Sequence, residues 1–148
     1  METIFVKVRT SKDIAISASV VILGLVLAFM PWGMGVNIAG YTLAIIGVII
    51  ACVLKSGYKT ANNDAIFKLK QLTYEPARRS EIMKAMSSKP EALTLAGEGD
   101  GLTLRLDIYY STASEMAYIQ LSEYVPHEYK PCSDVYEYNK TRVIHLLK

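Results

Sequence analysis

Cys132 comes nearest to a nucleophilic site in this sequence, because His127, Asp134 and His145 follow or precede it at short range. A cysteine hydrolase needs a thiolate, an imidazole base and an orienting group that the fold brings together. The spacing of these four residues matches no pattern of that class, and Cys132 lies beside prolines rather than at the start of a helix that follows a strand. We therefore expect a protein that is not an enzyme, and keep a cysteine-dependent hydrolase as a second alternative.

Metal and cofactor chemistry has little support, because the chain holds two histidines and two cysteines. A structural zinc site needs four such ligands, and Cys52 falls in an apolar run where it cannot easily pair with Cys132. Residues 97–101, Gly-Glu-Gly-Asp-Gly, lack both the ligand spacing of a calcium loop and the Lys-Ser/Thr of a phosphate-binding loop. We interpret them as a tight hairpin connection, and expect no metal and no cofactor.

Two uncharged apolar runs, residues 14–31 and 36–54, dominate the first part of the chain. Each is close to the roughly 20 residues that span a hydrocarbon core. Neither contains Asp, Glu, Lys, Arg or His, each of which would cost roughly 2.5 to 3.5 kcal/mol at mid-bilayer. The pattern predicts an N-terminal two-helix transmembrane hairpin over residues 14–54.

Two alternatives to this hairpin fit less well. A helical hairpin buried in a soluble protein would need more surrounding chain to cover two wholly apolar helices. A cleaved signal peptide would have a shorter apolar region followed by a small-x-small cleavage pattern, which the sequence after residue 28 does not show.

The flanking charges predict the orientation of the hairpin. Lys7, Arg9 and Lys12 precede the first run, Lys55 and Lys59 follow the second, and the connecting turn carries no charge. Lys and Arg beside a span are retained on the cytoplasmic side. We expect both termini in the cytoplasm, residues 1–13 as a leader lying along the membrane surface, and the bacterial inner membrane rather than another membrane.

Small residues recur along one face of the second run, at steps of four, three and four positions: Gly40, Ala44, Gly47 and Ala51. Such residues let another helix approach closely. We expect this helix-packing seam to hold the two helices of the hairpin together. A homo-oligomer contact and a docking face for another membrane protein remain alternatives.

After a linker over residues 55–64, residues 65–148 predict a small cytoplasmic α+β domain, with an antiparallel sheet of about three to five strands and one or two helices. Apolar and more polar residues alternate strictly over residues 102–109, which predicts a half-buried strand. Further strands are expected on either side of it, near 93–95 and 116–123. Residues 65–74 form a further expected strand. A helix is expected from Pro76 to Ser88, and a C-terminal helix from Ser133, with a last strand over 142–147 as the alternative.

Charge is divided unevenly along this domain. The part nearer the apolar runs is basic, and an anionic leaflet attracts cations by about 1 kcal/mol each near the surface. We expect these residues to face lipid: Lys55, Lys59, Arg78, Arg79 and Lys84. Nothing interleaves aromatics with the cations as a nucleic-acid platform would, so we do not expect nucleic acid as a partner.

The following part, residues 90–138, is acidic and rich in tyrosine. Tyrosine is favoured where a surface binds a protein. The candidate partner surface consists of Asp107, Tyr109, Tyr118, Glu123 and Glu128. In the alternatives, the charges form a solvated face without a partner, and the two tyrosines belong to a second core.

These features predict a bi-spanning membrane protein that works by binding, as an adaptor or inhibitor that holds a protein partner at the bilayer. Two membrane helices followed by a strand-rich cytoplasmic module also resemble, in architecture, some bacterial antiphage membrane effectors. The alternative function is a ligand-sensing membrane effector whose helices oligomerise and perturb the bilayer.

Overall fold

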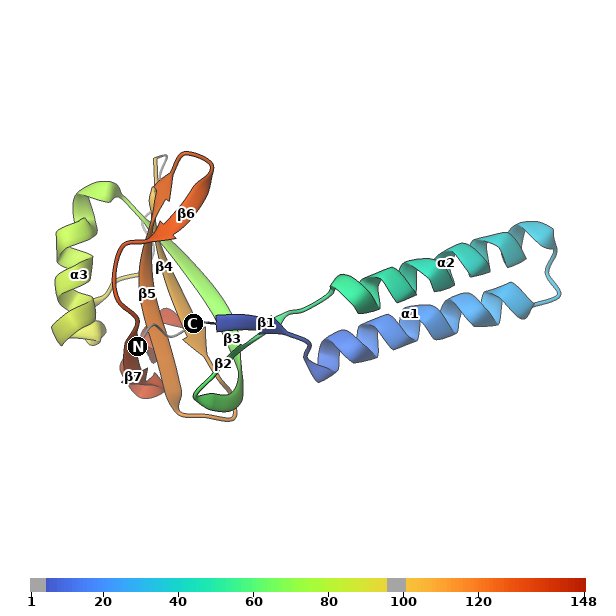
Figure 1. Ribbon diagram of the computed structural model, residues 1–148, viewed down its shortest axis with the longest axis horizontal. Helices are drawn as coiled ribbons and strands as arrows, with labels where there is room; N and C mark the ends of the chain where they lie inside the picture. Colours follow the sequence, from blue (N-terminus) through green and yellow to red (C-terminus); the bar gives the residue numbers. More distant parts are fainter. Residues whose placement is uncertain (1–4, 96–100) are drawn as a thin grey trace. The chain divides into compact units, whose positions relative to one another are not determined.

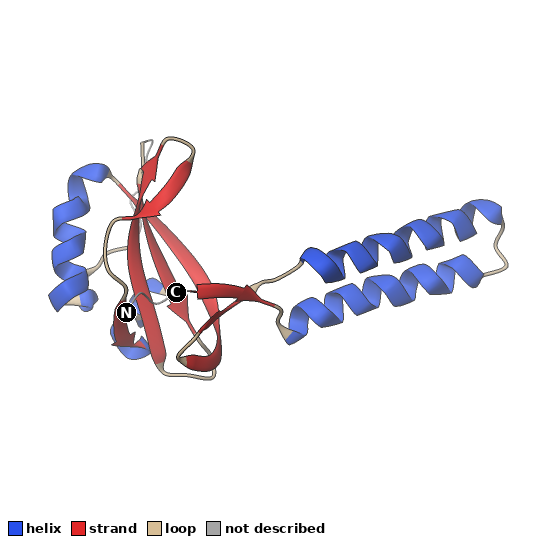
Figure 2. Ribbon diagram, viewed as in Figure 1, coloured by secondary structure: helices blue, strands red, loops and turns tan. Residues whose placement is uncertain are grey.

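The computed structural model describes residues 5–95 and 101–148, and the chain forms two compact units. One is the helical unit Lys7–Gly57, and the other is the sheet unit, Met1–Val6 with Tyr58–Lys148. Figure 1 labels the elements of both units, and Figure 2 separates helices from strands by colour. Residues 97–100, most of the expected glycine-rich connection, lie outside the described residues.

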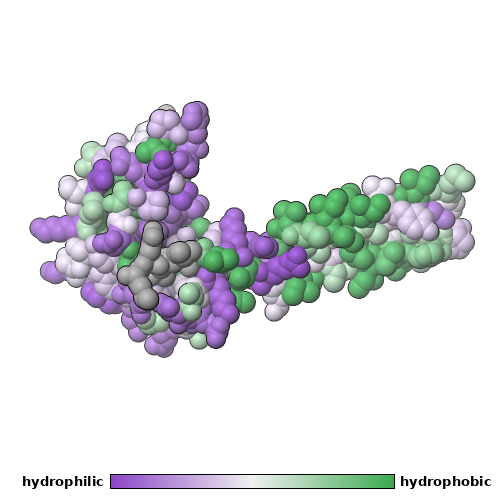
Figure 3. All heavy atoms as spheres, viewed as in Figure 1, coloured by the Kyte–Doolittle hydropathy of each residue, from purple (hydrophilic) through white to green (hydrophobic). Residues whose placement is uncertain are grey.

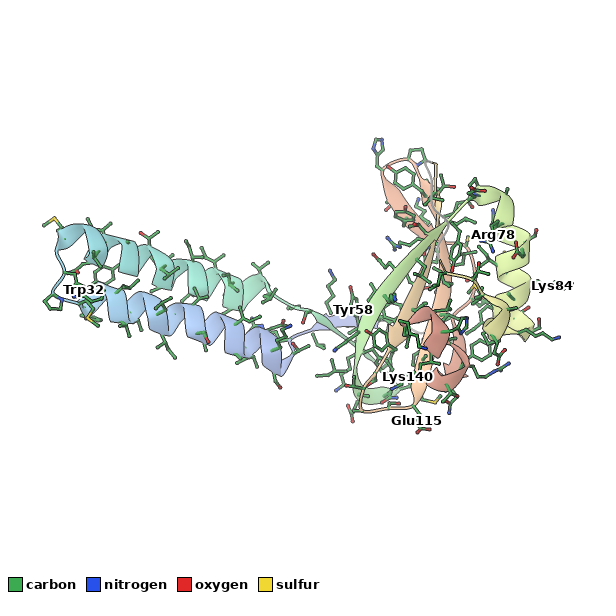
Figure 4. All side chains as sticks on the ribbon, turned by 180° about the vertical axis from the view of Figure 1, so that it is seen from behind. Trp32, Tyr58, Arg78, Lys84, Glu115 and Lys140 are labelled. Atoms are coloured by element: carbon green, nitrogen blue, oxygen red, sulfur yellow. The ribbon has the colours of Figure 1, made fainter. Side chains whose placement is uncertain are left out.

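The helical unit is a hairpin of α1, Ser11–Phe29, and α2, Met34–Val53. The first helix begins three residues before the apolar run, because Thr10 and Asp13 form a capping box in which each side chain accepts a hydrogen bond from the other's backbone N–H. Trp32 lies in the turn between the helices (Figure 4). Two long apolar N-terminal helices are therefore confirmed.

Asp13 also joins the two ends of the hairpin. Its Oδ2 accepts a hydrogen bond from the Ser56 backbone N–H at 2.9 Å, and its Oδ1 accepts one from the Ser56 hydroxyl at 2.7 Å. The carboxylate is only 4% exposed, so its lone pairs are directed to protein donors rather than to water. This clasp links the start of α1 to the chain that leaves α2.

The sheet unit is built on a seven-stranded sheet, larger than the three to five strands expected, with the order β1-β2-β3-β4-β5-β6, and β7 pairs with β5. The pairings from β2 to β6 and that of β7 with β5 are antiparallel. The strands are β1 Phe5–Val8, β2 Gly57–Thr60, β3 Asn63–Tyr74, β4 Leu104–Tyr110, β5 Met116–Val125, β6 Glu128–Pro131 and β7 Tyr136–Asn139. Helix α3, Arg79–Ser88, follows the 3-10 turn Pro76–Arg78. The expected strands over 65–74, 102–109 and 116–123 and the expected helix over 76–88 are present.

The main core lies between one face of the sheet and α3. In β4 the side chains of Leu104, Leu106 and Ile108 point into it, and Ile82 and Met86 meet them from α3. All five are at most 2% exposed. Alternating strand residues thus supply one side of the core, and residues four apart on the helix supply the other.

Two segments expected to be irregular are strands instead. The leader, expected on the membrane surface, contributes β1, and the expected linker contains β2 and the start of β3. Tyr58 of β2 pairs with Phe67 of β3, and Thr60 with Asn63. The sequence gives little sign of this, because short strands are stabilised by partners far along the chain rather than by their own periodicity.

Two further expectations are wrong. Residues 93–95 form no strand; they follow the 3-10 turn Pro90–Ala92 as irregular chain, and Leu93 packs into the main core. The region after Ser133 forms neither the expected helix nor a strand over 142–147, but β7 followed by the 3-10 turns Lys140–Arg142 and Ile144–Leu146. Tyr138 in β7 donates its hydroxyl hydrogen bond to the Met86 carbonyl, which anchors this segment on α3.

The opposite face of the sheet carries a second core, which is aromatic. Phe5 of β1 stacks on Tyr109 with ring centroids 3.7 Å apart, and meets Phe67 and Tyr118 edge-on at 6.4 and 5.6 Å. Tyr58 packs edge-on against Tyr109 at 5.2 Å. Each such pair contributes about 0.5–1.5 kcal/mol beyond the burial of its area, so β1 acts as a cover for this face.

We predict that Phe5→Ala lowers the free energy of unfolding of the sheet unit by about 2–4 kcal/mol, since it removes a packed aromatic ring. The neighbouring Val6→Ala, at a side chain that is 58% exposed, should change it by at most about 0.5 kcal/mol. Urea titration of the full-length protein, followed by near-ultraviolet circular dichroism, measures both. Equal effects of the two substitutions would show that β1 does not cover the aromatic face.

Candidate functional site

The expected partner surface separates into a buried part and an exposed part. Tyr118 is 6% exposed and Tyr109 is half-buried within the aromatic cluster under β1. Burial, with a smaller contribution from the negative charge of Asp107, raises the pKa of Tyr109 to about 12. The two tyrosines therefore belong to the second core, which is one of the two interpretations that the sequence allows, and Phe5 of β1 covers them.

Asp107 is also buried, with 4% of its surface exposed. Its Oδ1 lies 2.9 Å from Arg105 Nε and accepts a hydrogen bond from Gln71 Nε2 at 3.0 Å. Its Oδ2 accepts hydrogen bonds from Arg105 Nη2 at 3.0 Å and from the Ser122 hydroxyl at 3.3 Å. A carboxylate with this many donors is satisfied internally, so Asp107 links three strands instead of offering a free charge to a partner.

The exposed part lies on the arm, defined here as residues 124–129 at the β5–β6 turn. Strand β4 stops pairing at Leu104, opposite Glu123, so the arm extends beyond it (Figure 1). The end of the arm is exposed, and Tyr124 is 49% exposed. Glu128, the expected partner residue, lies in the arm, whereas Glu123 lies just before it and forms an ion pair with Arg79 at 2.9 Å.

Pro126 and His127 form the two-residue turn of the arm. His127 has φ = 77°, which favours glycine. Holding a histidine there costs roughly 1–2 kcal/mol. The arm is nevertheless anchored, because Tyr129 packs edge-on against Tyr124 and under the guanidinium of Arg105, 4.2 Å from the ring centroid.

The residues expected to face lipid are mostly paired with acids. Lys59 lies 2.6 Å from Asp64, Arg78 lies 3.0 Å from Glu81, and Arg79 pairs with Glu123 as above. Within the described residues, Lys55 and Lys84 have no ion pair. In Figure 4 Lys84 points away from the sheet at the outer side of α3. The basic and acidic segments are thus partly paired with each other, which weakens the expected division into a lipid face and a partner face.

The candidate nucleophile has surroundings that disfavour a thiolate. Cys132 packs against the main core, and burial raises the pKa of its thiol. His145 Nε2 is hydrogen-bonded to the Leu93 carbonyl at 2.8 Å, and His127 lies at the end of the arm. Residues 5–95 and 101–148 contain no group of three His, Cys, Asp or Glu side chains that could hold a metal ion.

The small residues of α2 bring it into contact with α1. A Cβ built on Gly40 would lie 2.2 Å from the Ala28 backbone nitrogen, and one on Gly24 would lie 2.4 Å from that of Ala44. One on Gly47 would lie 2.8 Å from the backbone nitrogen of Val21. Only glycine permits this approach, so the Gly40 and Gly47 part of the seam packs the hairpin on itself.

Most side chains on the outward faces of the hairpin are apolar, with Ser19 and Thr42 among the polar exceptions, and Figure 3 shows this surface from one side. Both helices are long and apolar enough to cross a membrane. The exposed large hydrophobic side chains are Ile14, Ile16, Ile22, Leu23, Leu25, Val26, Phe29, Trp32, Met34, Ile38, Tyr41, Ile45, Ile46, Val48, Ile49 and Val53. A soluble protein rarely exposes an apolar patch of more than a few hundred Å² without a partner for it.

The comparisons with known proteins supply no relative for either unit. No family model matches the chain, and neither a curated protein nor a solved structure matches it.

We predict that Gly40→Ala separates α1 from α2, because the new methyl group meets backbone atoms that cannot move aside. Gly35→Ala is the matched control, since a Cβ there meets nothing within 4 Å. Unfolding of the full-length protein in mixed micelles with increasing SDS, followed by the fluorescence of Trp32, should require less SDS for Gly40→Ala than for the wild type. Gly35→Ala should behave like the wild type. An unchanged midpoint for Gly40→Ala would contradict the glycine contact.

Proposed function

We propose that the chain is an integral membrane protein whose hairpin crosses the bilayer twice and which holds its sheet unit at the cytoplasmic face as a binding protein. The observation that carries the proposal is the exposure of the apolar helices. Only 22% and 11% of their most apolar windows are buried, whereas a core helix of a soluble protein is mostly buried. Lipid removes this surface from water without any further protein.

The sheet topology supports an even number of crossings. Strand β1 precedes α1 and β2 follows α2, and the two strands are neighbours in one sheet. Both ends of the hairpin must therefore be on the same side of a membrane that the hairpin crosses. The cations Lys7, Arg9, Lys12 and Lys55 flank those ends, which favours the cytoplasmic side. The bacterial inner membrane is the proposed location.

This topology predicts the labelling of single cysteines introduced into a Cys52→Ser, Cys132→Ser background. Met34→Cys, at a side chain that is 81% exposed at the start of α2, should react with a membrane-impermeant maleimide in intact spheroplasts. Glu137→Cys, at an exposed position of β7, should react only after permeabilisation. The reverse pattern would overturn the orientation. Extraction of the protein by alkaline carbonate would overturn insertion itself.

The arm is the proposed partner surface, and the proposed role is that of an adaptor or inhibitor. It combines an exposed tyrosine, Tyr124, with an exposed carboxylate, Glu128, which forms a solvent-exposed ion pair with Lys130 at 3.1 Å, beside a two-residue turn that retains a strained histidine. Backbone strain persists where the surrounding structure enforces it and is concentrated at functional sites. This surface replaces the broader one expected from the sequence, because Asp107, Tyr109 and Tyr118 are used inside the sheet unit.

The two alternatives have weaker support. The ligand-sensing effector depended on the small-residue seam for assembly of its helices, and α1 occupies Gly40 and Gly47 of that seam. The cysteine-dependent hydrolase depended on Cys132, whose thiol pKa is raised by burial.

We predict that full-length protein purified in mild detergent from its own membranes carries a second protein in fixed stoichiometry. Glu128→Lys and Tyr124→Ala should reduce recovery of that protein at least tenfold, because central aromatic and charged contacts dominate interfaces. Glu137→Lys, an exposed reversal outside the arm, is the control. Mass analysis of the intact particle measures each case. Unchanged recovery with both arm variants would refute the arm, and particles made only of this chain would favour the ligand-sensing effector.

A further inference from the structure

The hairpin contains a groove of about 380 Å³ on one side, at the end where the chain enters α1 and leaves α2. Ser17, Ala18 and Val21 of α1 and Val48 and Ala51 of α2 line it, with Arg9 at one end. The groove exists because the side chains at Ser17, Ala18 and Ala51 are too small to fill the space between the larger ones. It lies wholly within the helical unit.

The surface of the groove between the helices is apolar, although Ser17, which lines it, has a polar side chain. The Ser17 hydroxyl donates a hydrogen bond to the Ile14 carbonyl of its own helix at 3.0 Å, and Ser17 is 5% exposed. The remaining α1 and α2 residues that line the groove offer only methyl, methylene or thiol groups. A polar ligand would lose its hydrogen bonds to water there without replacement, so the groove suits a hydrocarbon chain.

The end of the groove has the opposite character. Arg9 is exposed and, within the described residues, has no ion pair. The nearest acid along the chain is Asp13, whose carboxylate is bound by Thr10 and Ser56. A guanidinium group binds phosphate oxygens in a bidentate manner and with geometric specificity that lysine lacks. Among the described residues, the groove thus has at one end an arginine without an ion-pair partner.

The length of the groove is close to the thickness of the hydrocarbon layer of one leaflet. Along α1 it extends from Ile14 to Ile22, which at 1.5 Å per residue is about 12 Å. Half of a hydrocarbon core is about 15 Å. Arg9 precedes α1, so in the inserted hairpin it lies at the level of the lipid phosphates while the groove extends into the acyl region.

We propose that this groove binds one anionic phospholipid of the cytoplasmic leaflet, with an acyl chain lying in the groove along one side of the α1–α2 contact and the phosphate on Arg9. The inference rests on the proposed function, because it requires an inserted hairpin. It adds a lipid site of defined charge preference to a hairpin that would otherwise be only an anchor.

The test uses full-length protein, delipidated in mild detergent and titrated with phosphatidylglycerol or phosphatidylcholine, with bound lipid counted by native mass spectrometry. The wild type should hold one phosphatidylglycerol at concentrations where phosphatidylcholine is not retained. Arg9→Gln should weaken phosphatidylglycerol binding about tenfold, as expected for loss of a charge-assisted hydrogen bond. Ala18→Leu, which fills the groove, should weaken binding of either lipid.

The controls separate a site from general attraction. Lys12→Gln removes a nearby charge that does not line the groove, and Ala39→Leu adds the same bulk at an exposed position of α2; neither should change phosphatidylglycerol binding more than about twofold. An equal loss in Lys12→Gln, equal binding of the two lipids, or unchanged binding by Ala18→Leu would each overturn the lipid site. Carbonate extraction separates failure of the lipid site from failure of the proposed function. A protein that resists extraction but shows no preference for phosphatidylglycerol is inserted and lacks the site.

Discussion

Side-chain alternation along β4 is the constraint on which the sheet unit depends. Leu104, Leu106 and Ile108 point to one face, and Arg105, Asp107 and Tyr109 to the other. The first face needs a helix to cover it, which is α3. The second needs both an aromatic cover, supplied by Phe5, and partners for the buried Asp107 carboxylate, which are neutral hydrogen-bond donors from β3 and β5 and the guanidinium of Arg105 in β4. Strand β1 thus supplies the aromatic cover, and β3 and β5 supply hydrogen-bond donors to Asp107.

The parts of the fold that could be predicted are those with a local cause. The apolar runs, the alternation over residues 102–109 and the proline before α3 each act within a few residues of themselves. Strand β1 has no such signal, because Phe5 is recognised by Phe67, Tyr109 and Tyr118 rather than by its neighbours. The C-terminal segment is the opposite case, because it has a local signal that the structure does not follow. Its apolar residues have helical spacing, yet the segment forms β7 and two 3-10 turns.

The candidate site was harder to predict, because the order of charged residues along the sequence does not show which of them lie close together in the structure. Arg79 and Glu123 belong to segments of opposite expected role, yet they form an ion pair. Asp107 is an acid in an acidic segment, yet it is buried and saturated with donors. Only Glu128 of the expected carboxylates lies in the arm. From the sequence, Arg9 was interpreted only as a charge that orients the hairpin. The groove beside it could not be predicted, because its lining comes from two helices whose packing the sequence does not specify.

The pairing of β1 with β2 has a consequence for biosynthesis. The ribosome makes β1 first, but its neighbour β2 emerges only after both helices of the hairpin, so Phe5 is made well before its aromatic partners. If the hairpin inserts as proposed, a chain in which only one helix has crossed the bilayer would hold β1 and β3 in different compartments, and its sheet would be incomplete. Under the proposed insertion, completion of the sheet would follow only when both helices have crossed, and a chain that failed this step would leave the rings of Phe5, Tyr109 and Tyr118 without their packing partners.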